Sequence, residues 1–232
     1  MPSNSPDSNR LVSDRGGRTI VVALAAAIAL GALSSACSLA GTAGEGPIKH
    51  ETRTTQAFTR IDVGDQIQLV VRIGSAQPLE LEAQENLLPI VATDVRNGTL
   101  RIAGSRDFTS SHPVVVTIVM PSLDAIAMND GSQATIDGLD ADTFGVDLNG
   151  GAGLTATGTV RTVALDGNGG SRASLGDLAA ETVVVDLNGG GSATVRASEQ
   201  VTGDASGGAH LTVLGGARLM VDACCGGAVD RE

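Results

Sequence analysis

The residues that could bind a metal ion or act in catalysis are few and widely spaced in this chain. The three histidines, His50, His112 and His210, form no zinc-protease motif, and the chain has no nucleophile elbow and no phosphate-binding glycine loop. Two adjacent thiols, Cys224 and Cys225, are too few to hold zinc by themselves. They are predicted either to pack as small side chains or to form a vicinal disulfide in an oxidising compartment. We therefore expect no catalytic residues and no cofactor.

Aspartates recur at regular intervals in the second half of the chain. Asp147, Asp166, Asp186 and Asp204 each lie four residues before a glycine of a repeated turn. Carboxylates stacked on one outer face repel each other, and a bound cation would relieve this repulsion. The four residues are therefore candidate calcium ligands, although their spacing differs from that of the nonapeptide calcium repeat. Asp147 and Asp166 could also serve a polysaccharide-active site together with Arg172, but such a groove normally contains aromatic rings.

The turns that follow these aspartates define an internal repeat. Their marker glycines are spaced 18 to 20 residues apart, at Gly131, Gly151, Gly170, Gly190, Gly208 and Gly227. Apolar residues alternate with polar ones on both sides of each turn, which indicates two short strands per repeat. The apolar series are Ile126, Val146, Leu165 and Val185 before the turn, and Ala134, Leu154, Ala173, Ala193, Leu211, Ile136, Ala156, Leu175, Val195 and Val213 after it.

A single such repeat cannot bury its inward face, so the repeats must stack. The sequence predicts an all-β fold, a right-handed parallel β-helix or β-solenoid of about 19-residue coils over residues 123–232. A β-sandwich is the structural alternative. An asparagine column two residues before the glycines supports stacking, because asparagine tolerates a left-handed bend and can bond to the same amide in the next coil. This column comprises Asn129, Asn149, Asn168 and Asn188, followed by Ser206 and Cys225.

Residues 54–122 are predicted to form a strand-rich portion that precedes the solenoid. Apolar residues alternate at Ile67, Leu69, Val71 and Ile73, at Leu79 and Leu81, and at Val114, Val116, Ile118 and Met120. Asn97-Gly98 predicts a tight hairpin turn. One short helix could form over residues 85–92, where Pro89 limits it.

The composition excludes several classes of partner. The chain has 232 residues, a formal net charge of −11, three phenylalanines, and neither tryptophan nor tyrosine. Carbohydrate clamps and base-stacking surfaces need exposed rings, and nucleic acid needs basic residues, so we expect neither partner. The chain is 42% hydrophobic, which is too apolar for disorder. Its core must therefore consist of aliphatic side chains in a narrow space.

The N-terminus has the pattern of an export signal. Arg10, Arg15 and Arg18 precede an uncharged run over residues 19–44, whose apolar part covers residues 20–33. The lipobox-like segment Leu33-Ser-Ser-Ala-Cys37 follows, in which Ser34 replaces the usual leucine. We predict that residues 1–37 are a signal peptide, with lipidation at Cys37, and that residues 38–53 are a flexible tether. An uncleaved membrane-spanning helix and ordinary cleavage after Ala36 are the alternatives.

Several segments together resemble one protein family. They are Phe58-Thr-Arg-Ile-Asp-Val63, Asn86-Leu-Leu88, Arg96-Asn-Gly-Thr-Leu-Arg-Ile102, Met120-Pro-Ser-Leu123 and the Gly-Gly repeats. In this order they resemble the head GIN domain of bacterial auto-transporter adhesins, from residue 54 to the C-terminus. The resemblance implies an exported β-helical envelope domain, often lipid-anchored, without an established enzymatic activity or an active site. The Cys224-Cys225 pair departs from the Ser-Gly-Gly turn that the pattern leads us to expect in the last coil.

Three functions remain open on the sequence alone. The first is an exported, membrane-anchored and non-enzymatic binding module of the cell envelope, with its domain outside the cytoplasm and an unidentified surface or protein ligand. The second is a structural envelope protein whose last coil stacks on another copy to give a homo-oligomer, because an uncapped solenoid ends in an open edge. The third is a polysaccharide-active enzyme. Whether the anchoring membrane is the inner or the outer one is left open.

Overall fold

The computed structural model describes residues 41–232, which form strands and no helix. These residues belong to one compact unit, Ser38–Glu232. The predicted signal peptide, the lipidation of Cys37 and the first residues of the predicted tether lie outside the described residues. Within residues 41–232, no helical segment has the length and apolar character needed to cross a membrane.

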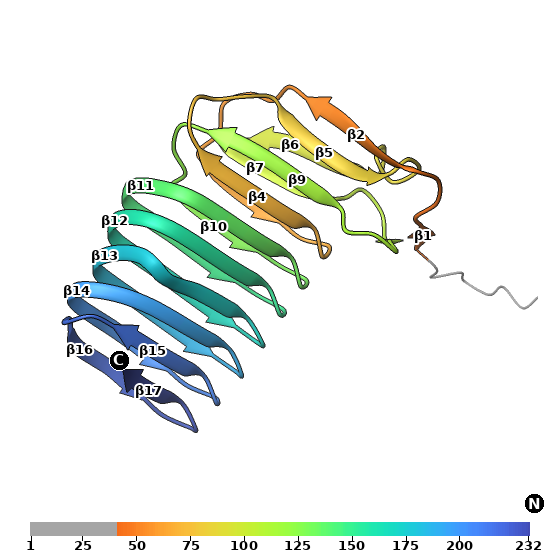
Figure 1. The fold of residues 1–232 in the computed structure, drawn as a ribbon. Helices are drawn as coiled ribbons and strands as arrows, with labels where there is room; N and C mark the ends of the chain where they lie inside the picture. The colour runs from red at the N-terminus through yellow and green to blue at the C-terminus, as the bar shows by residue number, and fades with distance from the viewer. Residues whose placement is uncertain (1–40) are drawn as a thin grey trace, which may run out of the picture. The chain divides into compact units, whose positions relative to one another are not determined.

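The second half of the chain is the predicted parallel β-solenoid (Figure 1). Its long strands each run along one face, bend, and return along the other: β11 (Gln133–Leu148), β12 (Gly153–Asn168), β13 (Arg172–Asn188) and β14 (Ser192–Ala205). Shorter strands complete it at both ends: β10 (Ala125–Met128), β15 (His210–Leu214), β16 (Arg218–Ala223) and β17 (Ala228–Arg231). Segments that follow the Gly-Gly turns pair with one another and form what we call sheet 1, and segments that precede the turns form sheet 2.

The strands of the N-terminal portion extend both sheets. Sheet 2 continues from β10 into β3 (Arg60–Val63), β7 (Thr99–Gly104) and β6 (Val91–Arg96). Sheet 1 continues from β11 into β4 (Gln68–Ile73), β9 (Val115–Met120), β5 (Leu79–Gln84) and β2 (Ile48–Arg53). The two-residue strands β1 (Thr42–Ala43) and β8 (Phe108–Thr109) pair separately. The two portions are therefore continuous parts of the same pair of sheets.

Local structure confirms one prediction in this portion and corrects two. Asn97 and Gly98, with φ of 51° and 74°, form the predicted two-residue hairpin between β6 and β7. The tether prediction is wrong for residues 48–53, because β2 pairs antiparallel with β5 and so satisfies its backbone groups. The predicted helix is also wrong: residues 85–90 form turns, and β6 begins at Val91.

The core lies between the two sheets and is narrow, as the composition predicts. The predicted apolar series of the repeats are all buried, and most of the core consists of Val, Leu, Ile and Ala. One ring enters this space, since Phe144 is 1% exposed. It lies in register with Val163, at the lateral bend of the coil.

Candidate functional site

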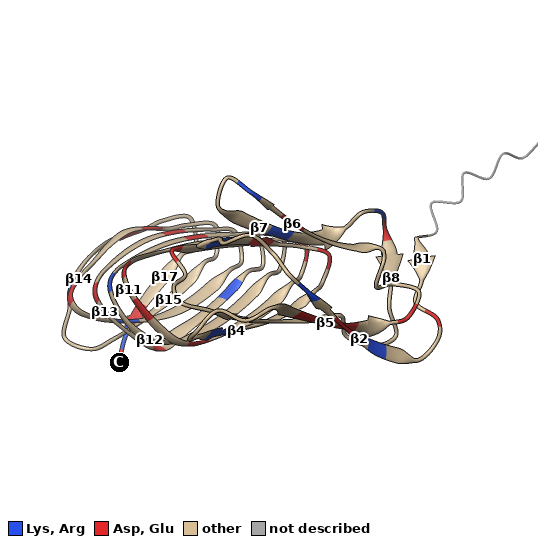
Figure 2. Ribbon diagram, turned by 90° about the horizontal axis from the view of Figure 1, so that it is seen from above, with Lys and Arg blue, Asp and Glu red and all other residues tan. Residues whose placement is uncertain are grey.

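The predicted aspartates form a continuous column on the outer face of sheet 2. Strand pairing places Asp147, Asp166, Asp186, Asp204 and Asp222 successively opposite one another, at the strand spacing of about 4.8 Å. All five are exposed, and we call the face that they form the acidic face (Figure 2). The sequence interpretation missed Asp222, because this residue lies five residues before the marker Gly227, and the other aspartates lie four residues before theirs.

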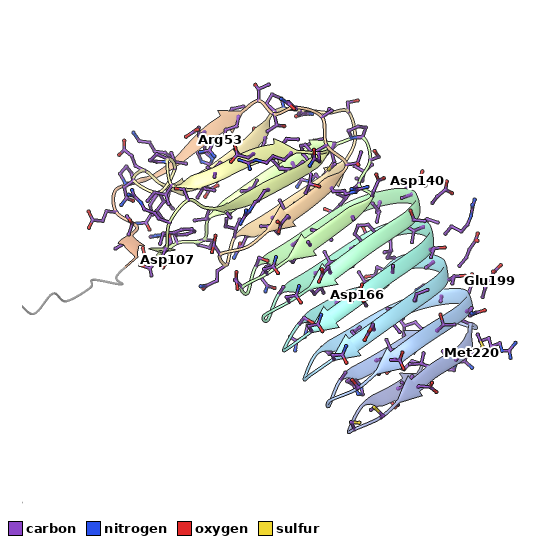
Figure 3. All side chains as sticks on the ribbon, turned by 180° about the vertical axis from the view of Figure 1, so that it is seen from behind. Arg53, Asp107, Asp140, Asp166, Glu199 and Met220 are labelled. Atoms are coloured by element: carbon purple, nitrogen blue, oxygen red, sulfur yellow. The ribbon has the colours of Figure 1, made fainter. Side chains whose placement is uncertain are left out.

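Asp166 is the second of the five aspartates, between Asp147 and Asp186, and points outward from β12 (Figure 3). Partial burial raises the pKa of the Asp166 carboxyl above its ordinary value, and the carboxylates of Asp186 and Asp147 on the two neighbouring strands raise it further. A cationic group placed over the column would relieve this repulsion. The acidic face is therefore suited to a partner that carries positive charge.

The asparagine column beside the carboxylates forms the predicted hydrogen bonds between coils, but its predicted left-handed conformation is wrong, because the positive φ falls on the next residue, such as Asp130 or Gly150. Asn149 Nδ2 donates to Asn129 Oδ1 at 3.3 Å, and Asn168 Nδ2 donates to Asn149 Oδ1 at 3.2 Å. Further along, Ser206 Oγ donates to Asn188 Oδ1 at 2.6 Å. These bonds link successive coils. Asn149 and Asn188 also donate from Nδ2 to Asp147 Oδ1 and Asp186 Oδ1, each at 2.7 Å, and so position these two aspartates.

The last member of this column differs from the prediction. The residue that follows Ser206 is Cys224, since Ala205 is in register with Ala223. Cys225 instead occupies the left-handed position, with φ of 58°, that Gly207 occupies in the preceding coil with φ of 65°.

A shallow hollow lies beside the column at its N-terminal end. It has a volume of about 420 Å³, and its floor is made by the small residues Ala125, Ala127, Gly145 and Ala164. Asp62, Asp147 and Asp166 line it along the aspartate column, and Arg60 and Thr99 line it in the neighbouring column. This hollow could receive an apolar or uncharged part of a partner whose cationic groups contact the aspartates.

The geometry does not form the catalytic arrangement considered from the sequence. Asp147 and Asp166 lie on sheet 2, whereas Arg172 pairs with Gly153 and Ser192 on sheet 1. Arg172 therefore lies on the opposite sheet from the two aspartates. Within residues 41–232, no group of three or more His, Cys, Asp or Glu residues is arranged to hold a metal ion. Calcium binding by the column stays a prediction.

Two other surfaces are weaker candidates for a binding site. A larger groove of about 710 Å³ follows the lateral bends, but its Arg161 is already paired with Asp142 at 3.2 Å and Glu181 at 3.8 Å.

The outer face of sheet 1 has an in-register hydroxyl column at Thr135, Thr155, Ser174, Thr194 and Thr212. The sequence interpretation missed this column, although each member lies four residues after a marker glycine. Neither surface combines unpaired like charges with a hollow.

The two C-terminal thiols are exposed and free in this structure. The thiols of Cys224 and Cys225 share a hydrogen bond, with their Sγ atoms 2.9 Å apart, and this bond favours the protonated form of the Cys224 thiol. This bond is the main cause that raises the pKa of the Cys224 thiol, and burial and the nearby carboxylates of Asp204 and Asp222 add to it. A raised thiol pKa leaves less of the reactive thiolate. The vicinal disulfide stays a prediction.

Solved structures with the same fold come from Bacteroides and Parabacteroides species. A "putative adhesin" from Bacteroides fragilis matches with a TM-score of 0.66 and 17% identity, covering 83% of this chain and 100% of that one. A second "putative adhesin", from Parabacteroides distasonis, matches with a TM-score of 0.53 and 16% identity over 83% and 100% of the two chains. A "putative lipid binding protein" from the same species has a TM-score of 0.50 and 11% identity over 83% and 99%. At these identities the likeness concerns the fold.

The family model gives the more specific comparison. No curated protein matches the chain. Residues 57–217 match the family described as "Putative auto-transporter adhesin, head GIN domain", as the sequence motifs had led us to expect. This match covers most of the chain and both sheets of the solenoid, including four of the five aspartates in the column. The chain therefore belongs to the head GIN domain family of adhesin-like proteins.

Proposed function

We propose that this protein is an exported, membrane-anchored and non-enzymatic binding module of the cell envelope, and that the acidic face is its binding surface. The observation that carries the proposal is the in-register column of five exposed carboxylates beside a hollow of small residues. Family membership supports the adhesin-like role. The partner presents cationic groups along an extended surface, because the carboxylates repeat at the strand spacing of about 4.8 Å.

Binding by the purified protein tests this role. The panel comprises whole bacterial cells, peptidoglycan, host matrix proteins and, as a chemical probe, a hexalysine peptide. We expect salt-sensitive binding to hexalysine and to at least one panel member, because exposed charges are screened by salt. If neither hexalysine nor any member of the panel binds, the proposed binding function is wrong.

A matched pair of variants tests the location of the site. Asp166→Asn combined with Asp186→Asn removes two charges from the acidic face, and Asp140→Asn combined with Asp177→Asn removes two charges from exposed positions elsewhere. We expect the first variant to weaken hexalysine binding by about tenfold, and the second to leave it nearly unchanged. Equal losses in both variants would show that net charge, rather than this face, determines binding.

The proposed anchor has a separate test. Replacing Cys37 by serine in the full chain should prevent lipidation, so that the protein leaves the detergent phase or accumulates at unprocessed size. Cys224→Ser is the control, because it also removes one thiol and serine already stands at the equivalent position of the previous coil. A Cys37→Ser protein that still partitions into detergent at mature size would rule out the lipid anchor.

A further inference from the structure

The strands at the two ends of the paired sheets make different contacts. At the N-terminal end, Arg53 of β2 donates from Nη1 to the Val91 carbonyl at 2.6 Å and from Nη2 to the Leu88 carbonyl at 2.7 Å, which ties sheet 1 to the start of β6. At the C-terminal end, among residues 41–232, β16 pairs with β14 alone, and β17 pairs with β15 alone. Each of these last strands therefore presents a free backbone edge.

The edge of sheet 1 is protected by an inward charge. Arg231 of β17 lies in register with the buried Val213, in a column whose other side chains face the core, and its guanidinium donates to the Ala217 carbonyl. An inward-pointing charged residue is one way in which proteins prevent an edge strand from pairing. The edge of sheet 2 has no equivalent in β16. Its inward residues, Leu219 and Val221, are apolar and only partly buried.

The outward residues of β16 are Arg218, Met220 and Asp222. Met220 is 43% exposed, and it is one of the few large apolar side chains on the described surface (Figure 3). Asp222 is opposite Asp204 of β14, so a like charge lies on the neighbouring strand. A further strand beside β16 could cover the exposed Met220 side chain and place a positive charge near Asp222.

The sequence of β16 is complementary to itself in the antiparallel direction. With a two-fold axis at Met220, Arg218 of each copy faces Asp222 of the other copy, and Leu219 faces Val221 on the core side. The two methionines meet at the axis. A centre between two residues would place an inward side chain opposite an outward one, for example Leu219 opposite Asp222. A centre at Leu219 or Val221 would keep the faces matched but would no longer place Arg218 opposite Asp222. The apolar pattern and the charges together therefore select the axis at Met220.

We propose that β16 of one molecule pairs antiparallel with β16 of a second copy around this axis and so joins their two sheets into one. The pairing satisfies the free backbone groups of β16, extends the core across Leu219 and Val221, and creates two cross-strand ion pairs. It leaves the protected edge of β17 unpaired. This inference is independent of the binding function proposed for the acidic face.

Charge exchange between copies tests the pairing. Arg218→Asp places two carboxylates opposite each other at each pairing position, and Asp222→Arg places two guanidinium groups opposite each other there. We expect each variant alone to dimerise at least about tenfold more weakly than the unaltered full chain in sedimentation equilibrium. An equimolar mixture of the two single variants should regain dimers, because the carboxylates of one variant then face the guanidinium groups of the other. Circular dichroism melting checks that both variants fold.

A disulfide at the axis tests the register. Met220→Cys in a Cys224→Ser, Cys225→Gly background should form a dimer under mild oxidation, because the two copies of residue 220 are directly opposite. Val184→Cys in the same background is the matched control, since Val184 is 47% exposed on the same face but lies away from the end. The proposal is overturned if the unaltered chain is monomeric at all concentrations, if the mixture does not regain dimers, or if both cysteine variants cross-link equally.

Discussion

Asp166 carries a negative charge that its surroundings in the acidic column disfavour. Burial and its two neighbours raise its pKa in the folded chain above the value in the unfolded chain, which is near the ordinary 3.8. Between these two pKa values the folded state binds more protons than the unfolded state, so stability falls as the pH rises through this window. At neutral pH the charged Asp166 therefore destabilises the fold.

Asp166→Asn should consequently stabilise the protein at neutral pH and low salt. We expect a gain of about 0.5 kcal/mol in the free energy of unfolding, because the side chain is largely solvated and like charges on neighbouring strands have modest effects. The gain should disappear below pH 3.8 and decrease in high salt. Urea unfolding at several pH values measures it, with Asp140→Asn as the control. A gain that persists unchanged in acid would contradict the electrostatic explanation.

Cys225 occupies a backbone conformation that suits glycine. Its φ of 58° is in the left-handed region, where earlier coils have Gly207, Gly189, Gly169 and Gly150. Cys225→Gly should raise the free energy of unfolding by up to about 1 kcal/mol, since a side chain there carries a steric cost. The converse change, Gly207→Ala, should lower it. Thermal melting of both variants compares them, and a less stable Cys225→Gly protein would mean that the thiol itself stabilises the last turn.

Strand stacking in this fold depends on close backbone approach at particular positions. Gly203 of β14 has φ of 129°, and a Cβ there would overlap the carbonyl oxygen of Val185 on the preceding strand. Gly203 also occupies the inward column between Val185 and Val221. A side chain at this position would therefore push two strands of sheet 2 apart.

Gly203→Ala should reduce the free energy of unfolding by about 2 kcal/mol or more, because the strand must shift and the backbone is strained. Gly190→Ala is the matched control. A Cβ on Gly190 would meet nothing within 4 Å, and its φ is not positive. Urea denaturation of both variants gives the difference. Similar stabilities for the two would show that β14 adapts to the added methyl group without loss.

The position of the free β16 edge has a consequence for the whole molecule. The edge strand β16 and the first strands, β1 and β2, lie at opposite ends of the paired sheets (Figure 1). Pairing through β16 then directs the two N-terminal ends away from each other. In a chain anchored through its N-terminus, such a pair would join two membranes.

Lipid vesicles that carry the purified full chain should therefore cluster. Vesicles with Arg218→Asp alone or Asp222→Arg alone should stay dispersed, whereas a mixture of the two populations should cluster, because only unlike copies have complementary edges. Turbidity measures the clustering. Clustering of either population by itself would indicate contacts other than β16, and the sedimentation experiment shows separately whether pairing or anchoring has failed.

The sequence alone determined the class of fold and the composition of its core. Alternation at period two and a turn repeat of 18 to 20 residues favour stacked strands over a β-sandwich, and an aromatic-poor composition fits a narrow interior. The same counting identified four of the five aspartates of the column. These features are local or periodic, so they can be read without knowing which segments meet.

The tertiary structure decided the features that depend on strand pairing. Residues 48–53 are polar enough to suggest a tether, but β5 offers them an edge, and backbone hydrogen bonds outweigh composition there. The position of Asp222 and the separation of Arg172 from Asp147 likewise follow from register and from the turn that divides the two sheets. Register across coils is set by the packing of inward side chains, which spacing along the chain describes only approximately.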